Sequence, residues 1–464
     1  SSSLADAVLT PDGEQLLYLA RFEKGFDLWS FKPRKKEIKL LSKLNASQVG
    51  GLEIDDDGKH VYLLADRSLR RIEISSGKPK PVKLSASMEL AAEAERDYLF
   101  EHVWRQTHKK FHDVEMHGVD WPAMKAAYAR FLPHISTNWD FAEMLSEMLG
   151  ELNASHTGSG HRPTRPNADA TAALGFFPDQ AWDGDGIRIL EIMEGSPLLQ
   201  AETRITDGTV ITAIDGEAIA AGENWYPHLN RKAGQPVRLT LVKGDDEWQE
   251  VVKPISHGAE YQLRYERWVR TRRAEVARLS DGRLGYAHIR GMSDGPFRQV
   301  FEDVFGDAVE AEGIILDTRF NGGGNLVEAL TQFLSGQTYM TAVPRGQFIG
   351  SEPSMRWTRP SIVVQNEGNY SDAHCFPNAY RTLGIGETVG TQVPGTCTAV
   401  WWETLQDRSL YFGIPQVTWT DADGDVLENK HFDPDHWVDN DPKLEAQGRD
   451  QQLEKAVEVL LASL

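Results

Sequence analysis

The sequence predicts a multidomain α/β protein, and three patterns along its 464 residues support this class. Short apolar runs alternate with helical segments after residue 257, as in a sheet covered by helices. Apolar residues recur at helical spacing over 88–152, and turn-and-strand patterns fill the first 85 residues. A chain of this length buries several cores. We expect domains at 1–86, 87–165, 166–256 and 257–464.

The N-terminal segment contains a short internal repeat. A turn at 10–13 (TPDG) precedes two strand-like runs, and a turn at 56–58 (DDG) precedes two more. A turn followed by alternating strands, with a period of about 45 residues, is typical of β-propeller blades. Two blades cannot close a propeller, so we expect 1–86 to be the remnant of a longer one. A pair of β-hairpins packed on the rest of the chain is the alternative.

The second segment, 87–165, is expected to be helical and to end in a glycine-containing loop. The apolar periodicity of 144–152 stops at the sequence NASHTG, which contains Ser155 and His156. Upstream, His108 and His112 have the i, i+4 spacing that zinc enzymes use on a helix. The glutamate of an HExxH motif is missing there, so we predict no metal site and no cofactor. A zinc hydrolase that uses His108 and His112 is nevertheless kept as the lowest-ranked of three functional hypotheses.

Residues 166–256 resemble a PDZ domain. The backbone N–H groups of the carboxylate-binding loop in such a domain hold a peptide terminus while the peptide adds a strand. Three further stretches at 194–198, 207–208 and 211–216 fit the same pattern. A small β-rich insert is the alternative. The residues predicted to bind peptide are Leu174, Gly175, Phe176 and Phe177.

The last segment, 257–464, contains three apolar runs that predict buried strands, at 284–289, 314–316 and 362–364. A run of three glycines follows the second strand, and such glycines can form a nest of N–H groups for an anion. A flexible loop or a phosphate cradle is the alternative. Ser371 follows the third strand, just before a helical segment. A serine on such a turn can be an exposed nucleophile, although ordinary turn chemistry explains it as well.

Four motifs in a fixed order carry a resemblance to a known family. They are SHTG at 155–158, DTRFNGGGN at 317–325, NEGNYSD at 366–372 and VLEN at 426–429. In this order they resemble the tail-specific (C-terminal processing) serine peptidases, and among these the tricorn proteases, from about residue 90 to the end. The resemblance implies a ClpP/crotonase-like α/β core. It also implies a serine endopeptidase that cleaves unfolded peptides or protein tails through an acyl-enzyme.

The resemblance also assigns a role to individual residues. In the family a serine is the nucleophile, a histidine is its general base, a second serine orients the histidine, and a glutamate supports that second serine. These are Ser371, His156, Ser155 and Glu428 in this chain. The oxyanion hole of the family uses N–H groups of the glycine loop and of the residue after the nucleophile. Here these are Gly323, with Gly322 as second choice, and Asp372.

The chain departs from the family pattern beside the nucleophile. Where the family has Ser-Asp-Gly-Asp, this chain has Ser-Asp-Ala-His, so His374 is an alternative base. No aspartate lies between residues 325 and 370, where the acidic residues are Glu328, Glu352 and Glu367, so we expect no preference for Lys or Arg before the cleaved bond. Phe348 and Trp357 are expected to line an apolar pocket instead. Glu352 would overturn this expectation if it pointed into the pocket. Cys375 and Cys397 form either one disulfide or two thiols.

The composition limits the classes of partner. Acidic residues outnumber basic ones, 69 to 49, which argues against nucleic acid and anionic membranes. No apolar run approaches the roughly 20 residues of a membrane span. The sequence opens without a signal peptide, but it also lacks an initiator Met, so this carries no information on the compartment. We expect peptides or unfolded proteins as partners, and the resemblance implies a homo-oligomer in the cytoplasm, with the periplasm as alternative. A non-catalytic peptide-binding scaffold is the rival function.

Overall fold

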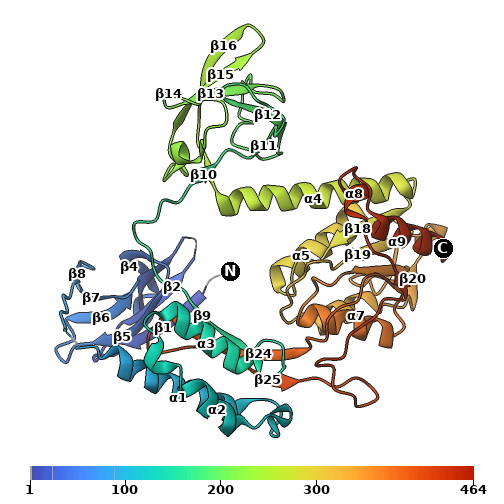
Figure 1. Ribbon diagram of the computed structural model, residues 1–464. Helices are drawn as coiled ribbons and strands as arrows, with labels where there is room; N and C mark the ends of the chain where they lie inside the picture. Colours follow the sequence, from blue (N-terminus) through green and yellow to red (C-terminus); the bar gives the residue numbers. More distant parts are fainter. Residues whose placement is uncertain (1–2, 23, 88) are drawn as a thin grey trace. The chain divides into compact units, whose positions relative to one another are not determined.

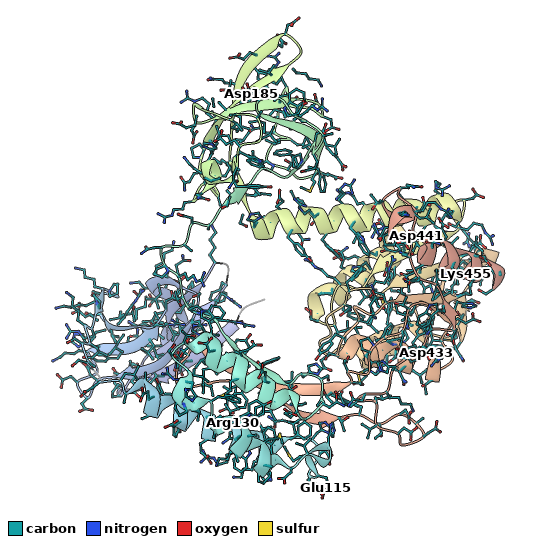
Figure 2. The ribbon with its side chains drawn as sticks, viewed as in Figure 1. Glu115, Arg130, Asp185, Asp433, Asp441 and Lys455 are labelled. Atoms are coloured by element: carbon teal, nitrogen blue, oxygen red, sulfur yellow. A yellow bond between two sulfur atoms is a disulfide. The ribbon has the colours of Figure 1, made fainter. Side chains whose placement is uncertain are left out.

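The computed structural model describes residues 3–22, 24–87 and 89–464 of the chain (Figure 1). The chain divides into two compact units, 1–91 and 92–464. Among the described residues, no helix is both long enough and apolar enough to cross a membrane. Exposed acidic side chains such as Glu115, Asp185 and Asp441 come from separate segments of the second unit (Figure 2).

The first unit consists of two antiparallel sheets of four strands, each in sequence order. Apolar side chains such as Leu17, Leu28, Val61 and Ile72 form its buried core. Each turn of the internal repeat thus precedes two strands of one sheet, while a propeller origin stays a prediction. The strands are β1 (Ser3–Leu9), β2 (Leu16–Arg21), β3 (Phe26–Lys32), β4 (Glu37–Ala46), β5 (Val49–Ile54), β6 (His60–Ala65), β7 (Ser68–Glu73) and β8 (Pro79–Pro81).

The second unit begins with three helices, α1 (Ala92–Lys110), α2 (Trp121–Ala129) and α3 (Asn138–Gly150). The Thr137 side chain caps α3 by accepting the Asp140 N–H. Because α1 ends at Lys110, His112 lies beyond the helix, and the expectation of a two-histidine helical face was wrong. Among the described residues, no three His, Cys, Asp or Glu side chains are grouped to hold a metal ion.

The helices share their core with the C-terminal part of the chain. Phe141 and Leu145 of α3 pack in one cluster with Phe412 and Ile414 of β25 (Leu410–Thr418). The strand after α3, β9 (Gly158–His161), pairs antiparallel with β25, which in turn pairs with β24 (Thr398–Thr404). The predicted boundary at residue 165 therefore divides the sequence but does not divide this core.

The segment expected to resemble a PDZ domain forms a six-stranded antiparallel sheet in the order β11-β12-β13-β15-β16, with β14 beside β13. The expected loop at 174–177 overlaps β11, an edge strand of the sheet that contains Phe176 and Phe177. β10 and β17, which lie at the two ends of this segment in the sequence, pair antiparallel with each other. The strands are β10 (Ala172–Ala173), β11 (Phe176–Pro178), β12 (Ile187–Ile192), β13 (Val210–Ile214), β14 (Glu217–Ala218), β15 (Val237–Lys243), β16 (Asp246–Val252) and β17 (Ile255–Ser256).

The C-terminal segment is built on a parallel sheet of five strands, in the order β18-β19-β22-β23-β26. All residues of β19 and β22 are buried, which explains their continuous apolar runs. The strands are β18 (Leu284–His288), β19 (Gly313–Asp317), β22 (Ser361–Gln365), β23 (Thr388–Gly390) and β26 (His436–Trp437), and a hairpin of β20 (Met340–Ala342) and β21 (Gly350–Glu352) precedes β22.

Helices pack in two groups against this sheet (Figure 1). One core contains α5 (Asp294–Glu302), α6 (Val327–Leu334) and α7 (Asp372–Thr382), and the other contains α4 (His257–Leu279) and α9 (Gln451–Ala462). A short α8 (Pro442–Glu445) precedes α9. The carboxyl ends of the neighbouring strands β19 and β22 lead to the glycine run and to Ser371, so parallel pairing brings these two turns together.

Candidate active site

Ser371 lies on a strained turn between β22 and α7. Its backbone has φ 59° and ψ −127°, a conformation that costs a side chain-bearing residue about 1–3 kcal/mol. Surrounding contacts hold it there: its N–H donates to Thr396 Oγ1 at 2.9 Å, and the nearby Asn369 side chain donates to Thr318 Oγ1 at 2.8 Å. A strained strand-to-helix turn of this kind presents a serine hydroxyl above the sheet.

The glycine run packs directly against this turn. Gly323 has φ 94°, and a Cβ atom there would lie 2.5 Å from the Cβ of Ser371. Only glycine fits at this position. Its N–H already donates to Asn321 Oδ1 at 2.9 Å. The N–H groups of Gly322 and Asp372 have no acceptor within the described part of the chain. Of the three expected oxyanion donors, Gly322 and Asp372 are therefore the two that are free.

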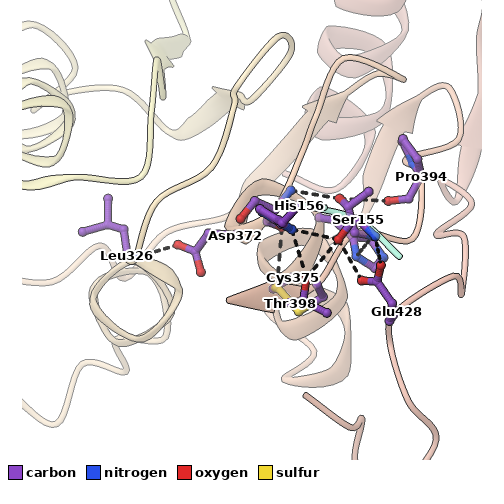
Figure 3. Close-up of a disulfide and its surroundings, with 12 residues drawn as sticks. Ser155, His156, Leu326, Asp372, Cys375, Pro394, Thr398 and Glu428 are labelled. Atoms are coloured by element: carbon purple, nitrogen blue, oxygen red, sulfur yellow. Dashed lines mark hydrogen bonds between the residues drawn. A yellow bond between two sulfur atoms is a disulfide. The ribbon is translucent and has the colours of Figure 1, made fainter. Parts of the chain in front are cut away.

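Asp372 joins the two turns through its side chain. Its carboxylate accepts the N–H of Leu326 at the start of α6 (Figure 3). Burial raises the pKa of this carboxyl group. This hydrogen bond fixes the position of the glycine run relative to the turn that carries Ser371.

The second half of the site is a hydrogen-bonded cluster around His156 (Figure 3). His156 Nδ1 lies 2.8 Å from Ser155 Oγ and 2.9 Å from Thr398 Oγ1. Ser155 Oγ donates to Glu428 Oε2 at 3.0 Å, and the Ser155 N–H donates to Glu428 Oε1. Ser155 and Glu428 are 273 residues apart in the sequence. The pairing of β9 with β25 brings the loop after α3 to the turn that follows β25.

Tyr370 connects this cluster with the nucleophile turn. Its hydroxyl accepts the His156 N–H at 2.7 Å, and the centres of the two rings are 4.7 Å apart. His156 thus packs on the residue that precedes Ser371. Within the described residues no hydrogen bond joins Ser371 Oγ to the imidazole. Such bonds tighten when substrate binds.

Burial sets the protonation of the cluster. It lowers the pKa of His156 to about 4 and raises the pKa of Glu428. His156 is therefore neutral near pH 7. His374 is fully buried, and burial lowers its pKa to about 4 as well. Its Nδ1 accepts the Thr396 N–H at 3.2 Å, so this ring holds the segment that supports Ser371.

The two cysteines form a disulfide beside the site. Cys375 lies one helical turn after Ser371, and Cys397 lies between Thr396 and Thr398. The bond therefore ties the start of α7 to the segment that contacts both Ser371 and His156. Sequence reasoning missed the two threonines, for which no motif exists. It also missed Tyr370, although this residue stands inside the motif NYSD.

A cavity of about 450 Å³ lies beside Asp372 and the disulfide. Its walls include Val327, Trp419 and Leu427. Of its carboxylates, Asp421 pairs with Lys430 at 2.6 Å, and Glu328 is exposed. The expectation that Trp357 lines such a pocket was wrong. Trp357 is buried in the core of the sheet and donates Nε1–H to the Pro360 carbonyl.

Phe348, the other expected lining residue, is exposed in the hairpin between β20 and β21 and is absent from the described lining of this cavity. The cavity wall beside Asp372 consists instead of α6, α7 and the segment around Trp419. Acidic residues outside the interval 325–370 thus reach the cavity, which the sequence argument did not consider. The expected lack of preference for Lys or Arg stays a prediction.

Buried side chains and a hydrogen bond from Ser196 hold the expected peptide-binding loop in place. Leu174 and Phe176 are buried, and Gly175 has φ 71°. The Leu174 carbonyl accepts from Ser196 Oγ at 2.8 Å. Phe177 is half-buried beneath the Arg264 guanidinium, 5.1 Å from its ring centre.

Comparisons with known proteins agree with this architecture. Three family models match the chain: the tricorn protease C1 domain at 92–150, the tricorn protease PDZ domain at 186–257 and peptidase family S41 at 283–438. These matches confirm the resemblance of the chain to the tricorn proteases and to family S41, a family of serine-type peptidases. The S41 match includes Ser371 and Glu428, whereas the loop at 174–177 precedes the PDZ match.

Two curated relatives show how much of a tricorn protease this chain represents. Tricorn protease homolog 1 of Streptomyces coelicolor is 30% identical over 91% of this chain and 42% of its own length. Tricorn protease of Thermoplasma acidophilum is 27% identical over 73% of this chain and 32% of its own length. The chain thus spans less than half the length of these relatives. A crystal structure of the tricorn protease matches 99% of this chain's fold with a TM-score of 0.87 at 21% identity, over 46% of that chain.

Proposed function

We propose that this chain is a serine endopeptidase that acts through the tetrad Ser371, His156, Ser155 and Glu428. The observation that carries the proposal is the hydrogen-bonded chain from Glu428 through Ser155 to His156, packed by Tyr370 against the strained turn of Ser371. A nucleophile on a strained turn, next to an oriented neutral imidazole, is the arrangement that acyl transfer requires.

The hydrogen-bond directions make His156 a base. When ionised, Glu428 accepts a hydrogen bond from the Ser155 hydroxyl, and Ser155 Oγ then accepts in turn from His156 Nδ1–H. With the proton on Nδ1, the lone pair of Nε2 is free to take a proton. Thr398 Oγ1, 2.9 Å from Ser155 Oγ, completes the support of this tautomer.

The reaction follows from these positions. Ser371 Oγ attacks the peptide carbonyl carbon while His156 Nε2 takes its proton. The N–H groups of Gly322 and Asp372 stabilise the negative oxygen of the tetrahedral intermediate. His156 returns the proton to the leaving amine, which leaves an acyl-enzyme on Ser371. Water, activated by the same imidazole, then hydrolyses the ester and restores the serine.

The proposed substrates are unfolded peptides or protein tails. Two of the three carboxylates described in the lining of the cavity, Asp372 and Asp421, are already engaged, whereas Glu328 is exposed. The apolar walls of this cavity support an apolar rather than a basic side chain before the cleaved bond. Capture of a peptide by the loop at 174–177, a ClpP/crotonase-like core, a propeller origin of 1–86 and assembly into a homo-oligomer are parts of the same proposal. The edge position of β11 supports the capture of a peptide, and the parallel sheet supports the ClpP/crotonase-like core.

A comparison of inhibitors tests the proposed function against its rivals. A serine-directed phosphonate should abolish cleavage of an unfolded protein substrate and, with loss of its leaving group, transfer the phosphonyl group to Ser371, which peptide mass spectrometry detects. A chelator should leave cleavage unchanged. Loss of activity with the chelator alone would favour a zinc hydrolase. Peptide binding without any cleavage or labelling would favour the scaffold.

The pH dependence of cleavage should reflect the partly buried imidazole of His156. Because the pKa of His156 is about 4, the base stays neutral well below pH 6. We expect kcat/KM to be flat between pH 8 and pH 6 and to fall with a midpoint below the ordinary histidine value of about 6.5. A midpoint at 6.5 or above would contradict this environment for His156.

The pH experiment needs a control for folding. Histidines in the unfolded chain titrate at about 6.5, so His156 and His374, with pKa values of about 4, bind fewer protons in the folded state. Their contribution to stability therefore decreases as the pH falls below about 6.5. Tryptophan fluorescence at each pH separates acid unfolding from protonation of the base.

A further inference from the structure

A second cavity, of about 460 Å³, lies between α4 and the carboxyl end of β18. Its size is in the range of ligand-binding pockets. Four aromatic side chains form its walls, and none of the described residues that line it is acidic. These aromatic residues are Tyr261, Tyr265, Trp268 and Phe320.

Two guanidinium groups lie in this cavity, in a protein of net charge −20. Arg290 lies 4.1 Å from the ring centre of Tyr265 and donates to the neutral side chain of Gln262. Within the described part of the chain, no carboxylate lies within 4.0 Å of Arg290. Arg264 has a single carboxylate neighbour, Glu260, at 3.5 Å. The cavity is therefore positively charged and suits an anion.

The floor of the cavity is held by buried hydrogen bonds. His288 Nε2–H donates to the Arg319 carbonyl at 3.1 Å, and the Tyr265 hydroxyl donates to His288 Nδ1 at 2.8 Å. Arg319 itself is buried and paired with Asp317 and Asp450. Burial lowers the pKa of His288, so the ring is neutral. These internal contacts fix the side chains of the floor, and fixed side chains reduce the entropy cost of binding.

The position of the cavity connects the peptide-binding loop with the nucleophile. Arg264 lines the cavity and also lies over Phe177. At the other side, Phe320 is 66% exposed, has φ 63° and donates its N–H to Asn366. Gly323 follows three residues later and packs against Ser371, so the Phe320 and Gly323 backbones lie at most about 10 Å apart.

We propose that this cavity is a substrate subsite that binds a peptide carboxylate through Arg290, with the aromatic walls packing on the neighbouring apolar atoms. The inference rests on the proposed peptidase function and specifies its substrate as a peptide with an acidic group a few residues from the cleaved bond. The carboxylate comes either from an acidic side chain or from the peptide C-terminus. Arg290 offers the two-pronged donor geometry that a carboxylate matches.

The test measures binding apart from cleavage, in the full chain with Ser371→Ala. Calorimetry compares three otherwise identical peptides: neutral and amidated, amidated with one Glu, and neutral with a free C-terminus. We expect at least one carboxylate peptide to bind about tenfold more tightly than the neutral one, as for a charged hydrogen bond. Arg290→Gln should remove that advantage without weakening the neutral peptide. The peptide that loses affinity identifies the source of the carboxylate.

A matched control is Arg298→Gln, which removes an exposed arginine of α5 that pairs with Asp294. This variant should keep the advantage of the carboxylate peptide. If the unmodified cavity shows no such advantage, or Arg290→Gln retains it, the subsite is refuted. The protein with Ser371 intact is also assayed for cleavage. If it cleaves no peptide but the tighter binding of the carboxylate peptide still depends on Arg290, the peptidase proposal is refuted and the subsite is retained.

Discussion

Replacing Ser371 with alanine should reduce peptide cleavage by at least about 10⁴-fold, because loss of the nucleophile leaves only binding and oxyanion stabilisation. Peptide binding should stay unchanged, since the removed hydroxyl makes no hydrogen bond within the described residues. Initial rates with an internally quenched peptide measure the loss, and thermal unfolding verifies that the variant is folded.

The matched control for this experiment is Ser354→Ala, which truncates an exposed serine before the sheet strand β22. It should retain the full rate. Cleavage by the Ser371→Ala variant at more than a small fraction of the parent rate would remove Ser371 from the nucleophile position. A variant without a thermal unfolding transition is not folded, so its loss of activity would say nothing about the role of Ser371.

Replacing His156 with alanine should cost about as much as replacing Ser371, and the double variant should lose little more. Members of one catalytic unit are strongly non-additive, because the serine hydroxyl is a weak nucleophile without its base. The rates of the two single variants and the double variant, measured with the same peptide, test this. Additive losses would show that the two residues act independently.

His374→Ala separates the two candidate bases. Since His374 is buried and accepts the Thr396 N–H, its loss should loosen the segment behind Ser371 and lower stability as well as rate. His156→Ala should lower the rate with little effect on stability, because its ring is only partly buried. An active His156→Ala variant beside a folded but inactive His374→Ala variant would transfer the base to His374.

Much of the fold was predictable because its signals are local. The apolar runs at 314–316 and 362–364 predicted β19 and β22, since strands buried on both faces require continuous apolar sequence. The periodicity before residue 152 predicted helices, and the turn-strand repeat predicted the two N-terminal sheets. Where a local signal was weak, prediction failed: α1 ends before His112, and Trp357 belongs to the core.

The candidate site was partly predictable through its motifs. Ser155, His156, Ser371 and Glu428 each stand in a short motif, and the order of the motifs carried the resemblance. The supporting residues could not be found in this way. Thr396 lies in a loop and Thr398 begins β24, and no motif marks either of them. They support the site because the disulfide and the contact of His374 with Thr396 hold this segment in place. The engaged state of the Gly323 N–H is likewise visible only in three dimensions.

What the sequence by itself determined is therefore the set of elements and the chemical types available to the site. The tertiary structure decided which of these groups meet. Glu428 reaches Ser155 across 273 residues because β9 pairs with β25, and the glycine run reaches Ser371 because β19 and β22 are parallel neighbours. Local propensity acts over a few residues, whereas such contacts depend on how distant apolar surfaces close into common cores. The cationic cavity between α4 and β18 has the same origin, since Arg290 and Phe320 become neighbours only in the folded chain.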